Sequence, residues 1–580
     1  MAPLIAEKSG GVGSSSSAIS VRLRVKGWCD MSFVIRKSLP SISGLLGLLL
    51  VVGFAFVFFL GAPVWFPVAF AIVMVGVQFA INPWIIQWLV PATVIERAGG
   101  RYLTDHVVGE LVAKRCREAG VPLVQLGIVD DGTPNAFTFG HTPRDARMWV
   151  TRGLLERLDT DELDAVIAHE VGHVRNWDFA IMTVAAVVPM VLYLMYVVAR
   201  GADRNEARMV AIGAYVAYLL SQFTLLSLSR AREYAADHWS CAATANGDAL
   251  ASALVKVAYG MGQVHAEQKD EVAALIAQGK EGKKEAAKRQ SHWRRAQSMK
   301  AMGIFEPRSA DALAAAFARG IDPERAVAAM RWDVVNPWGR TLEKLSSHPL
   351  VARRIEALEE SGLPGAPRQW SVLRSLTAVS ADQRMQARAL FGRELAVATT
   401  PWIVLVALVV FGAFTGSATS VGLALTVAGS LLVYKQHLRY PPMYMPVDQV
   451  TSLLERLDAG PVAGIGVEVK GQVIGRGFPG YVLSPDLVVQ DGSGFVPLLY
   501  RQPIPFAAAL FGLFRVDKFM GQDVVARGWY RRTPGPVIEL RDVRAADGRT
   551  ARTWEWVARY AASILLAVAG VIVMLAGVGG

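Results

Sequence analysis

The sequence contains few charged residues and few cysteines. Asp, Glu, Lys and Arg make up only 19% of its 580 residues, whereas 53% are hydrophobic. Such a composition excludes an ordinary soluble enzyme and an intrinsically disordered chain. Cys29, Cys116 and Cys241 lie far apart without a CxxC pair, which excludes a disulfide framework and a thiolate metal site. The chain is therefore predicted to be a polytopic membrane protein.

Long uncharged apolar runs give the number of membrane spans. A helix needs about 20 apolar residues to cross the hydrocarbon core of a bilayer. The sequence meets this requirement seven times, near residues 42–61, 64–88, 179–199 and 209–229, twice within 395–434, and at 560–580. We therefore expect a mainly α-helical protein with about seven transmembrane helices.

The basic residues predict the orientation. Residues 1–40 carry six Lys or Arg against two acidic residues, and such an excess keeps a segment in the cytoplasm. Alternation through seven spans then places the large hydrophilic segments 91–178, 230–394 and 435–559 on the cytoplasmic side as well. The expected location is the plasma membrane of a prokaryote.

The segment before the third predicted span contains the pattern HExxH, formed by His169, Glu170 and His173. Residues four apart share one face of a helix, so the two histidines can bind one Zn²⁺. Glu170 then lies beside the metal, where a carboxylate can take a proton from an attacking water.

A catalytic zinc normally has three protein ligands. Glu233 and Asp237 follow the fourth predicted span and are four residues apart, which suits one metal ligand and one carboxylate that orients a histidine. The alternative is a solvated helix with Arg–Glu pairs. One membrane hairpin separates Glu233 from HExxH, so both should reach the same membrane surface. Membrane proteins and juxtamembrane segments are therefore the expected substrates.

In combination, these motifs resemble the HtpX-like integral membrane zinc metallopeptidases, which include the CAAX prenyl proteases. The resemblance covers roughly residues 95–360 and depends on segments 135–137, 150–158, 169–178, 232–237 and 347–355. It implies a mainly helical gluzincin core with a small sheet, and one zinc ion per chain held by His169, His173 and Glu233. Glu170 would be the general base and acid.

Three short strands are expected at 124–129, 135–140 and 147–151. An edge strand beside a metal could bind an extended substrate through its backbone. Asn135 and Phe137 would then lie near the cleft, although an ordinary structural strand is as good an explanation for Phe137.

Four further residues are candidates for contacts around the metal. His348 could donate a hydrogen bond to the oxyanion or position the substrate, or it could be a surface histidine before a proline turn. Either Arg353 or Arg354 could pair with Asp237. Asp178 ends the HExxH helix and belongs to the same group.

The predicted organisation alternates hydrophilic and membrane segments. Residues 91–178 and 230–394 would form two parts of a metallopeptidase domain, interrupted by a basic insert at 264–335. The insert is interpreted as a solvated helix, with attraction to anionic lipid as the alternative. The other segments are a cytoplasmic tail (1–40), membrane segments (41–90, 179–229, 395–434 and 560–580), and a β-rich domain (435–559).

Short strands in the β-rich domain predict a small barrel, for which an OB-like fold is one interpretation. The domain could dock substrates, regulate the enzyme or be purely structural. No nucleic-acid motif accompanies the basic charge, so no nucleic-acid partner is expected.

The leading functional hypothesis is a zinc endopeptidase of the quality-control type. A narrow-specificity processing protease of the CAAX type and a catalytically silent membrane scaffold are the alternatives. The sequence predicts neither the cleavage specificity nor the oligomeric state.

Overall fold

The structure is a computed structural model. It describes residues 41–580 except 42, 46, 50, 59–62, 64, 203–204, 258–322, 477–483, 534 and 579–580. The predicted N-terminal tail and most of the basic insert 264–335 therefore lie outside the described residues.

Six helices of the described chain are long and apolar enough to cross a membrane, so the chain is a multi-pass membrane protein. They are α2 (Trp65–Leu89), α6 (Asp178–Arg200), α7 (Asn205–Thr244), α15 (Ala381–Thr415), α16 (Ala418–Arg439) and α19 (Glu555–Val578). The first predicted span corresponds to a shorter apolar helix, Ser43–Phe58, which is only partly described. A total of seven spans thus stays a prediction.

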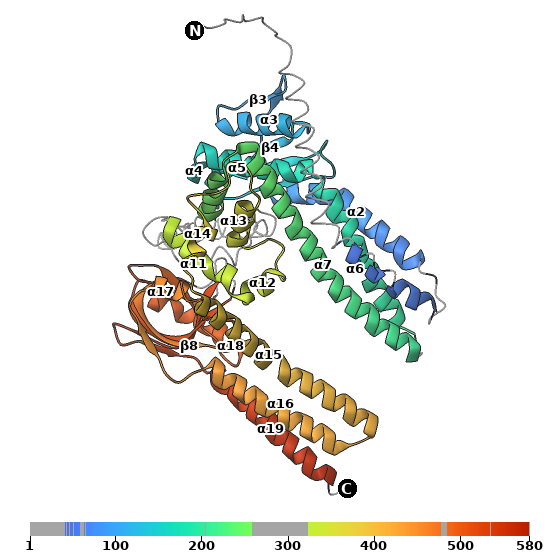
Figure 1. The fold of residues 1–580 in the computed structure, drawn as a ribbon, viewed down its shortest axis with the longest axis vertical. Helices are drawn as coiled ribbons and strands as arrows, with labels where there is room; N and C mark the ends of the chain where they lie inside the picture. The colour runs from blue at the N-terminus through green and yellow to red at the C-terminus, as the bar shows by residue number, and fades with distance from the viewer. Residues whose placement is uncertain are drawn as a thin grey trace, which may run out of the picture.

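The helices form two bundles. Figure 1 shows α2, α6 and α7 together, and α15, α16 and α19 together, with both bundles extending in the same direction from the hydrophilic parts. Glycines allow α16 and α19 to approach closely: a Cβ at Gly429 would lie 2.4 Å from the backbone nitrogen of Ala567. A tight turn joins α15 and α16, with Gly416 in the left-handed conformation (φ 65°) and Ser417 capping α16.

The first hydrophilic part contains a four-stranded sheet in the order β1-β4-β6-β5. Its strands are β1 (Thr93–Val94), β4 (Gln125–Val129), β6 (Arg147–Thr151) and β5 (Ala136–Phe139). Helices α3 (Val107–Ala119) and α5 (Thr160–Arg175) pack with β4 and β6 in one apolar core. Strand β5 is at the edge of the sheet.

Smaller elements complete this part of the chain: β2 (Arg97–Ala98), β3 (Arg101–Tyr102), α4 (Arg152–Arg157), α11 (Pro323–Val335), α12 (Pro337–Glu343), α13 (Val351–Glu360) and α14 (Val372–Leu376). Buried residues of α11, α13 and α14 belong to the same core as α5.

The C-terminal part contains a closed five-stranded barrel. Its strands are β8 (Ile465–Arg476), β9 (Leu487–Gln490), β10 (Phe495–Leu499), β11 (Asp523–Arg532) and β12 (Pro536–Ala545). Each strand pairs with the next in the order β10-β9-β8-β11-β12, and a parallel pairing of β10 with β12 closes the ring. This order, with a helix between β10 and β11, is the topology of an OB fold.

The barrel has several accessory elements: β7 (Met445–Val447), α17 (Val450–Leu454), α18 (Pro505–Phe514), the 3₁₀ helix Val516–Phe519 and β13 (Thr550–Arg552). It also contacts the first hydrophilic part. The Trp332 indole on α11 donates a 2.7 Å hydrogen bond to the carbonyl of Ala459, and Arg532 on β11 donates one of 3.2 Å to the carbonyl of Ala329.

Candidate metal centre

The centre forms where α5 crosses α7. Asp159 and Glu162 make a capping box that begins α5, and residues 165–174 of this helix are buried. Gly172 permits the crossing, since a Cβ there would lie 3.2 Å from the Cα of Ala236 on α7. The Ser240 hydroxyl on α7 donates a 2.6 Å hydrogen bond to the carbonyl of Ala165. Helix α7 is continuous over 40 residues, so a single helix carries both an apolar membrane segment and Glu233.

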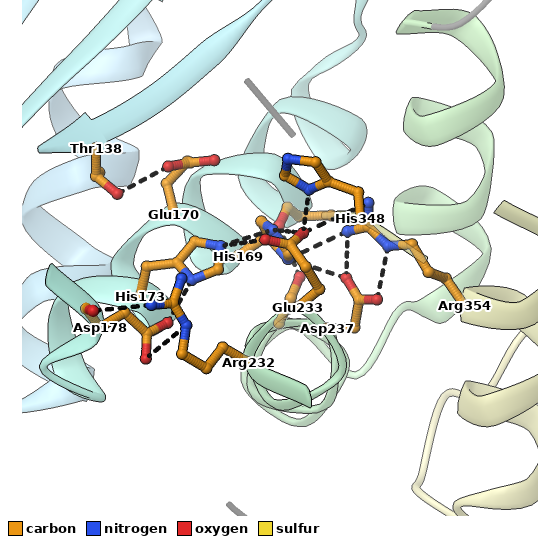
Figure 2. A network of polar contacts seen from close by, with 12 residues as sticks. Thr138, His169, Glu170, His173, Asp178, Arg232, Glu233, Asp237, His348 and Arg354 are labelled. Carbon is orange, nitrogen blue, oxygen red and sulfur yellow. Dashed lines mark hydrogen bonds and ion pairs between the residues drawn. The ribbon is translucent and has the colours of Figure 1, made fainter. Parts of the chain in front are cut away.

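The two histidines and Glu233 meet at this crossing (Figure 2). The Nε2 atoms of His169 and His173 are 3.2 Å apart. The carboxylate of Glu233 places Oε2 3.7 Å from Nε2 of His169 and Oε1 3.6 Å from Nε2 of His173. All three side chains are buried. The structure therefore brings the three predicted ligands together.

Each histidine is oriented by its own aspartate. Nδ1 of His169 lies 2.9 Å from Oδ1 of Asp237, and Nδ1 of His173 lies 2.6 Å from Oδ2 of Asp178. A neutral histidine whose Nδ1–H donates to a carboxylate carries its lone pair on Nε2. Both Nε2 lone pairs are therefore available to a metal at the centre. Asp178 is also the first residue of α6, so the centre lies next to a candidate membrane span.

The donor set suits a divalent ion. Oε2 of Glu233 is buried beside imidazole nitrogens, with Nδ1 of His348 3.1 Å away and Nε2 of His169 3.7 Å away. In a tetrahedral site with zinc–ligand bonds of about 2.1 Å, two ligand atoms lie about 3.4 Å apart. The donor atoms here are separated by 3.2 to 3.7 Å, which is close to that distance. Two imidazoles and a carboxylate are also ligands that Zn²⁺ accepts.

Glu170 lies beside these ligands and has a different partner. Its Oε2 accepts a 2.9 Å hydrogen bond from the hydroxyl of Thr138 on β5. One of its carboxylate oxygens lies within 4.8 Å of a ring nitrogen of each histidine. Burial raises the pKa of Glu170, while the neighbouring His173 and His169 act in the opposite direction.

Side chains alternate along β5, and this separates Phe137 from the centre. Thr138 contacts α5, whereas Phe137 packs with Phe139 and Trp149 in a separate apolar cluster. Phe137 is therefore a core residue. The backbone N–H of Asn135 donates a 2.8 Å hydrogen bond to the Thr151 hydroxyl, and the carbonyl of Asn135 accepts one of 3.0 Å from the backbone N–H of Thr151.

His348, which precedes α13, and Arg354, which lies on α13, complete the centre. Nδ1 of His348 lies 3.1 Å from Oε2 of Glu233, and Arg354 pairs with Asp237. Arg353 does not take that place, since its guanidinium donates to Glu356 (2.8 Å) and to the carbonyl of Val334 (3.1 Å). Of the two arginines left open by the sequence, the structure selects Arg354.

Two residues at the centre are absent from the sequence-based predictions. Thr138 holds Glu170, and Arg232 donates a 2.8 Å hydrogen bond to the carbonyl of Asp178. Alternation along the expected strand 135–140 could have indicated Thr138, and the motif segment 232–237, which begins with Arg232, could have indicated Arg232.

Comparison with known proteins agrees with this geometry. The model of peptidase family M48 matches residues 103–361. A "Protease HtpX homolog" from Methanothermobacter thermautotrophicus is 36% identical over 199 residues, which are 33% of this chain and 73% of the relative. The chain belongs to peptidase family M48.

This M48 peptidase also matches a second HtpX homologue and a solved structure. A "Protease HtpX homolog 2" from Methanosarcina acetivorans is 32% identical over 232 residues, which are 38% of this chain and 77% of the relative. The crystal structure of S. mikatae Ste24p aligns with 42% of this chain and 61% of that chain, at 18% identity and a TM-score of 0.28. The resemblance to HtpX-like membrane metallopeptidases is thus confirmed, and this M48 chain is a membrane-associated metallopeptidase.

Proposed function

We propose that the chain is a zinc-dependent endopeptidase that hydrolyses membrane proteins or membrane-proximal polypeptides, in a quality-control role. The observation that carries the proposal is the convergence of His169, His173 and Glu233, with both Nε2 atoms 3.6 to 3.7 Å from the Glu233 carboxylate. These three residues would hold one Zn²⁺. When bound, the ion would act as a Lewis acid on the peptide carbonyl and on the attacking water.

Glu170 is the proposed general base and acid. It takes a proton from the attacking water and gives it to the amide nitrogen of the departing peptide, so the products are two shorter peptides. Its raised pKa, caused mainly by burial, suits a group that must both accept and release this proton. The Thr138 hydroxyl keeps the carboxylate in place.

His348 has a proposed positioning role. Nδ1 of His348 lies 3.1 Å from Oε2 of Glu233, so the ring can fix the orientation of the ligand carboxylate. Donation of a hydrogen bond to the oxyanion is the second role that this position allows.

Strand β5 is the proposed binding site for the substrate backbone. It pairs with β6 on one side, and in the described residues no strand pairs with its other side. An extended peptide could add to that edge by β-augmentation. Since Thr138 of β5 contacts Glu170, a peptide bound there would pass the proposed base.

The position of the centre motivates the proposed substrate class. His173 contacts the first residue of α6, and Glu233 belongs to α7, so the ligands lie where the hairpin meets the hydrophilic domain. The basic residues 1–40 support a cytoplasmic site in a prokaryotic plasma membrane. A lipid bilayer and polypeptide substrates are the proposed partners.

Replacement of the proposed base tests the function. The variant Glu170→Gln should keep one zinc ion per chain and lose cleavage of a membrane-protein substrate reconstituted in the same liposome. Glu156→Gln is the matched control, because it changes an exposed carboxylate on α4. Wild-type turnover by Glu170→Gln would exclude the proposed base, whereas no cleavage by the zinc-loaded wild type would favour a scaffold role for the centre.

A further inference from the structure

A second cluster of charged residues lies where the barrel meets the membrane helices. Lys435 and Arg439 are one turn apart near the end of α16, Arg559 is near the start of α19, and Arg531 lies on β11. None of these residues belongs to the metal centre. We refer to the four as the junction cluster.

Among the described residues, two carboxylates contact the junction cluster. Glu539 on β12 is shared: it pairs with Arg531, accepts a 3.1 Å hydrogen bond from Arg439 and accepts another of 2.8 Å from the hydroxyl of Tyr440. Glu555 accepts a 2.8 Å hydrogen bond from Arg559. Four cations therefore face two anions, which leaves an excess of positive charge.

Arg531 shows that this excess is not fully satisfied within the described chain. Its side chain is 4% exposed, and its Nη1 atom is buried without a hydrogen-bond partner among the described residues. Burial, followed by the charges of Arg439 and Arg559, lowers the pKa of Arg531 to about 9. An anion placed on the cluster would stabilise this buried guanidinium, because it would offset the excess positive charge around it.

The surroundings identify the kind of anion. Tyr440, Trp529, Trp556 and Tyr560 form a chain of aromatic contacts around the cluster, with ring centroids 4.7 to 6.3 Å apart. Such rings are enriched where a membrane protein passes through the headgroup layer. The end of α16 and the start of α19 also define that layer, so lipid phosphate is the anion present there at high local concentration.

We propose that the junction cluster binds the headgroup of an anionic phospholipid. The partly exposed guanidiniums of Arg439 and Arg559, whose side chains are 20% and 45% exposed, contact the phosphate. Guanidinium groups suit this task because their parallel N–H groups match two phosphate oxygens. Arg531 lies behind them and strengthens the positive field. The net charge of the cluster favours an anionic lipid over a zwitterionic one, whose headgroup carries its own cation.

Native mass spectrometry of the full-length protein tests this proposal. Protein extracted from vesicles that contain equal amounts of phosphatidylglycerol and phosphatidylcholine should retain phosphatidylglycerol preferentially. A basic residue beside an anionic lipid surface contributes about fivefold in affinity. The double variant Arg439→Gln/Arg559→Gln should therefore retain about 25-fold less phosphatidylglycerol, and the corresponding double Lys variant should recover most of the retention.

A matched control removes two exposed arginines elsewhere. Arg368 and Arg544 are exposed residues outside the junction cluster, so Arg368→Gln/Arg544→Gln should retain lipid as the wild type does. If the double variant at the junction misfolds, the single variant Arg559→Gln affects only an exposed side chain and should lose about fivefold. Equal retention by wild type and junction variants would overturn the proposal.

Excess inorganic phosphate distinguishes the two sources of phosphate. Retention of phosphatidylglycerol in its presence supports a lipid site. Complete release of the lipid by phosphate would overturn the lipid assignment, because the cluster would then be a site for a soluble anion.

Discussion

Arg354 and Asp237 form a buried, two-pronged ion pair behind the metal centre, although 117 residues separate them. Nε of Arg354 donates to Oδ2 of Asp237 at 2.8 Å, and Nη2 contacts Oδ1 at 2.6 Å. Oδ1 also lies 2.9 Å from Nδ1 of His169. One arginine on α13 therefore fixes the carboxylate that orients a proposed ligand on α5 (Figure 2).

Removal of this arginine should weaken both stability and metal binding. Arg354→Ala leaves Asp237 as an unpaired buried charge, which costs about 3–5 kcal/mol. Arg354→Lys keeps the charge but loses the two-pronged geometry, so zinc affinity should fall about 10- to 100-fold. Competition with a fluorescent chelator measures the affinity, and chemical denaturation in detergent measures the stability.

Arg353→Lys is the matched control for Arg354, since the neighbouring guanidinium pairs with Glu356 away from the centre. It should leave zinc affinity unchanged. Equal losses in both Lys variants would show that α13 stabilises the domain as a whole and does not orient His169 through Asp237.

Thr138→Val should slow catalysis and leave the metal in place. The Thr138 hydroxyl donates to Glu170, and this hydrogen bond lowers the pKa of the carboxyl. Its loss should reduce kcat/KM about tenfold. The pKa of Glu170 should rise further, so the acidic limb of the pH–rate profile should move to higher pH. Thr138→Ser keeps the hydroxyl and should restore both properties; an acidic limb that stays in place in Thr138→Val would refute the link.

Asp333 should make stability depend on pH. It is buried where α11 meets the barrel, 3.7 Å from Arg532, and burial raises its pKa from 3.8 to about 6 despite that arginine. The folded state therefore binds the proton more tightly than the unfolded chain. The resulting destabilisation is absent below about pH 4, grows as pH rises to 6 and is complete above it. Its size is on the order of 2–3 kcal/mol.

Replacement by asparagine tests this sign. Asp333→Asn should raise the thermal midpoint of unfolding in detergent at pH 8 and have little effect at pH 4. Asp523→Asn, at an exposed position on β11, should change neither value. A lower midpoint for Asp333→Asn at pH 8 would contradict this sign. It would mean that the ion pair with Arg532 stabilises the contact between α11 and the barrel more than burial of the charge destabilises it.

Local sequence patterns were sufficient for much of the centre. His169 and His173 share a helix face by their spacing, and a single membrane hairpin returns the chain to Glu233, so their convergence followed from helix geometry. Membrane spans could be predicted for the same reason, since each depends only on a local run of apolar residues.

Contacts that depend on the relative positions of distant elements could not be predicted in this way. The choice between Arg353 and Arg354 depends on how α13 is rotated against α7. The roles of Phe137 and Thr138 depend on which face of β5 meets α5. Strand β8 contains a register shift between Val473 and Gly475, which interrupts the alternation of side chains without ending the pairing, and such a shift cannot be predicted from a local pattern.

The metal content of a ligand variant tests the central claim most directly. Elemental analysis of purified protein should give one zinc ion per chain for the wild type and for Glu170→Gln, and far less than one for Glu233→Gln. Loss of zinc in Glu233→Gln, together with retention of zinc in Glu170→Gln, would distinguish the proposed ligand from the proposed base. A full complement of zinc in Glu233→Gln, or none in the wild type under zinc-replete conditions, would contradict a centre formed by His169, His173 and Glu233.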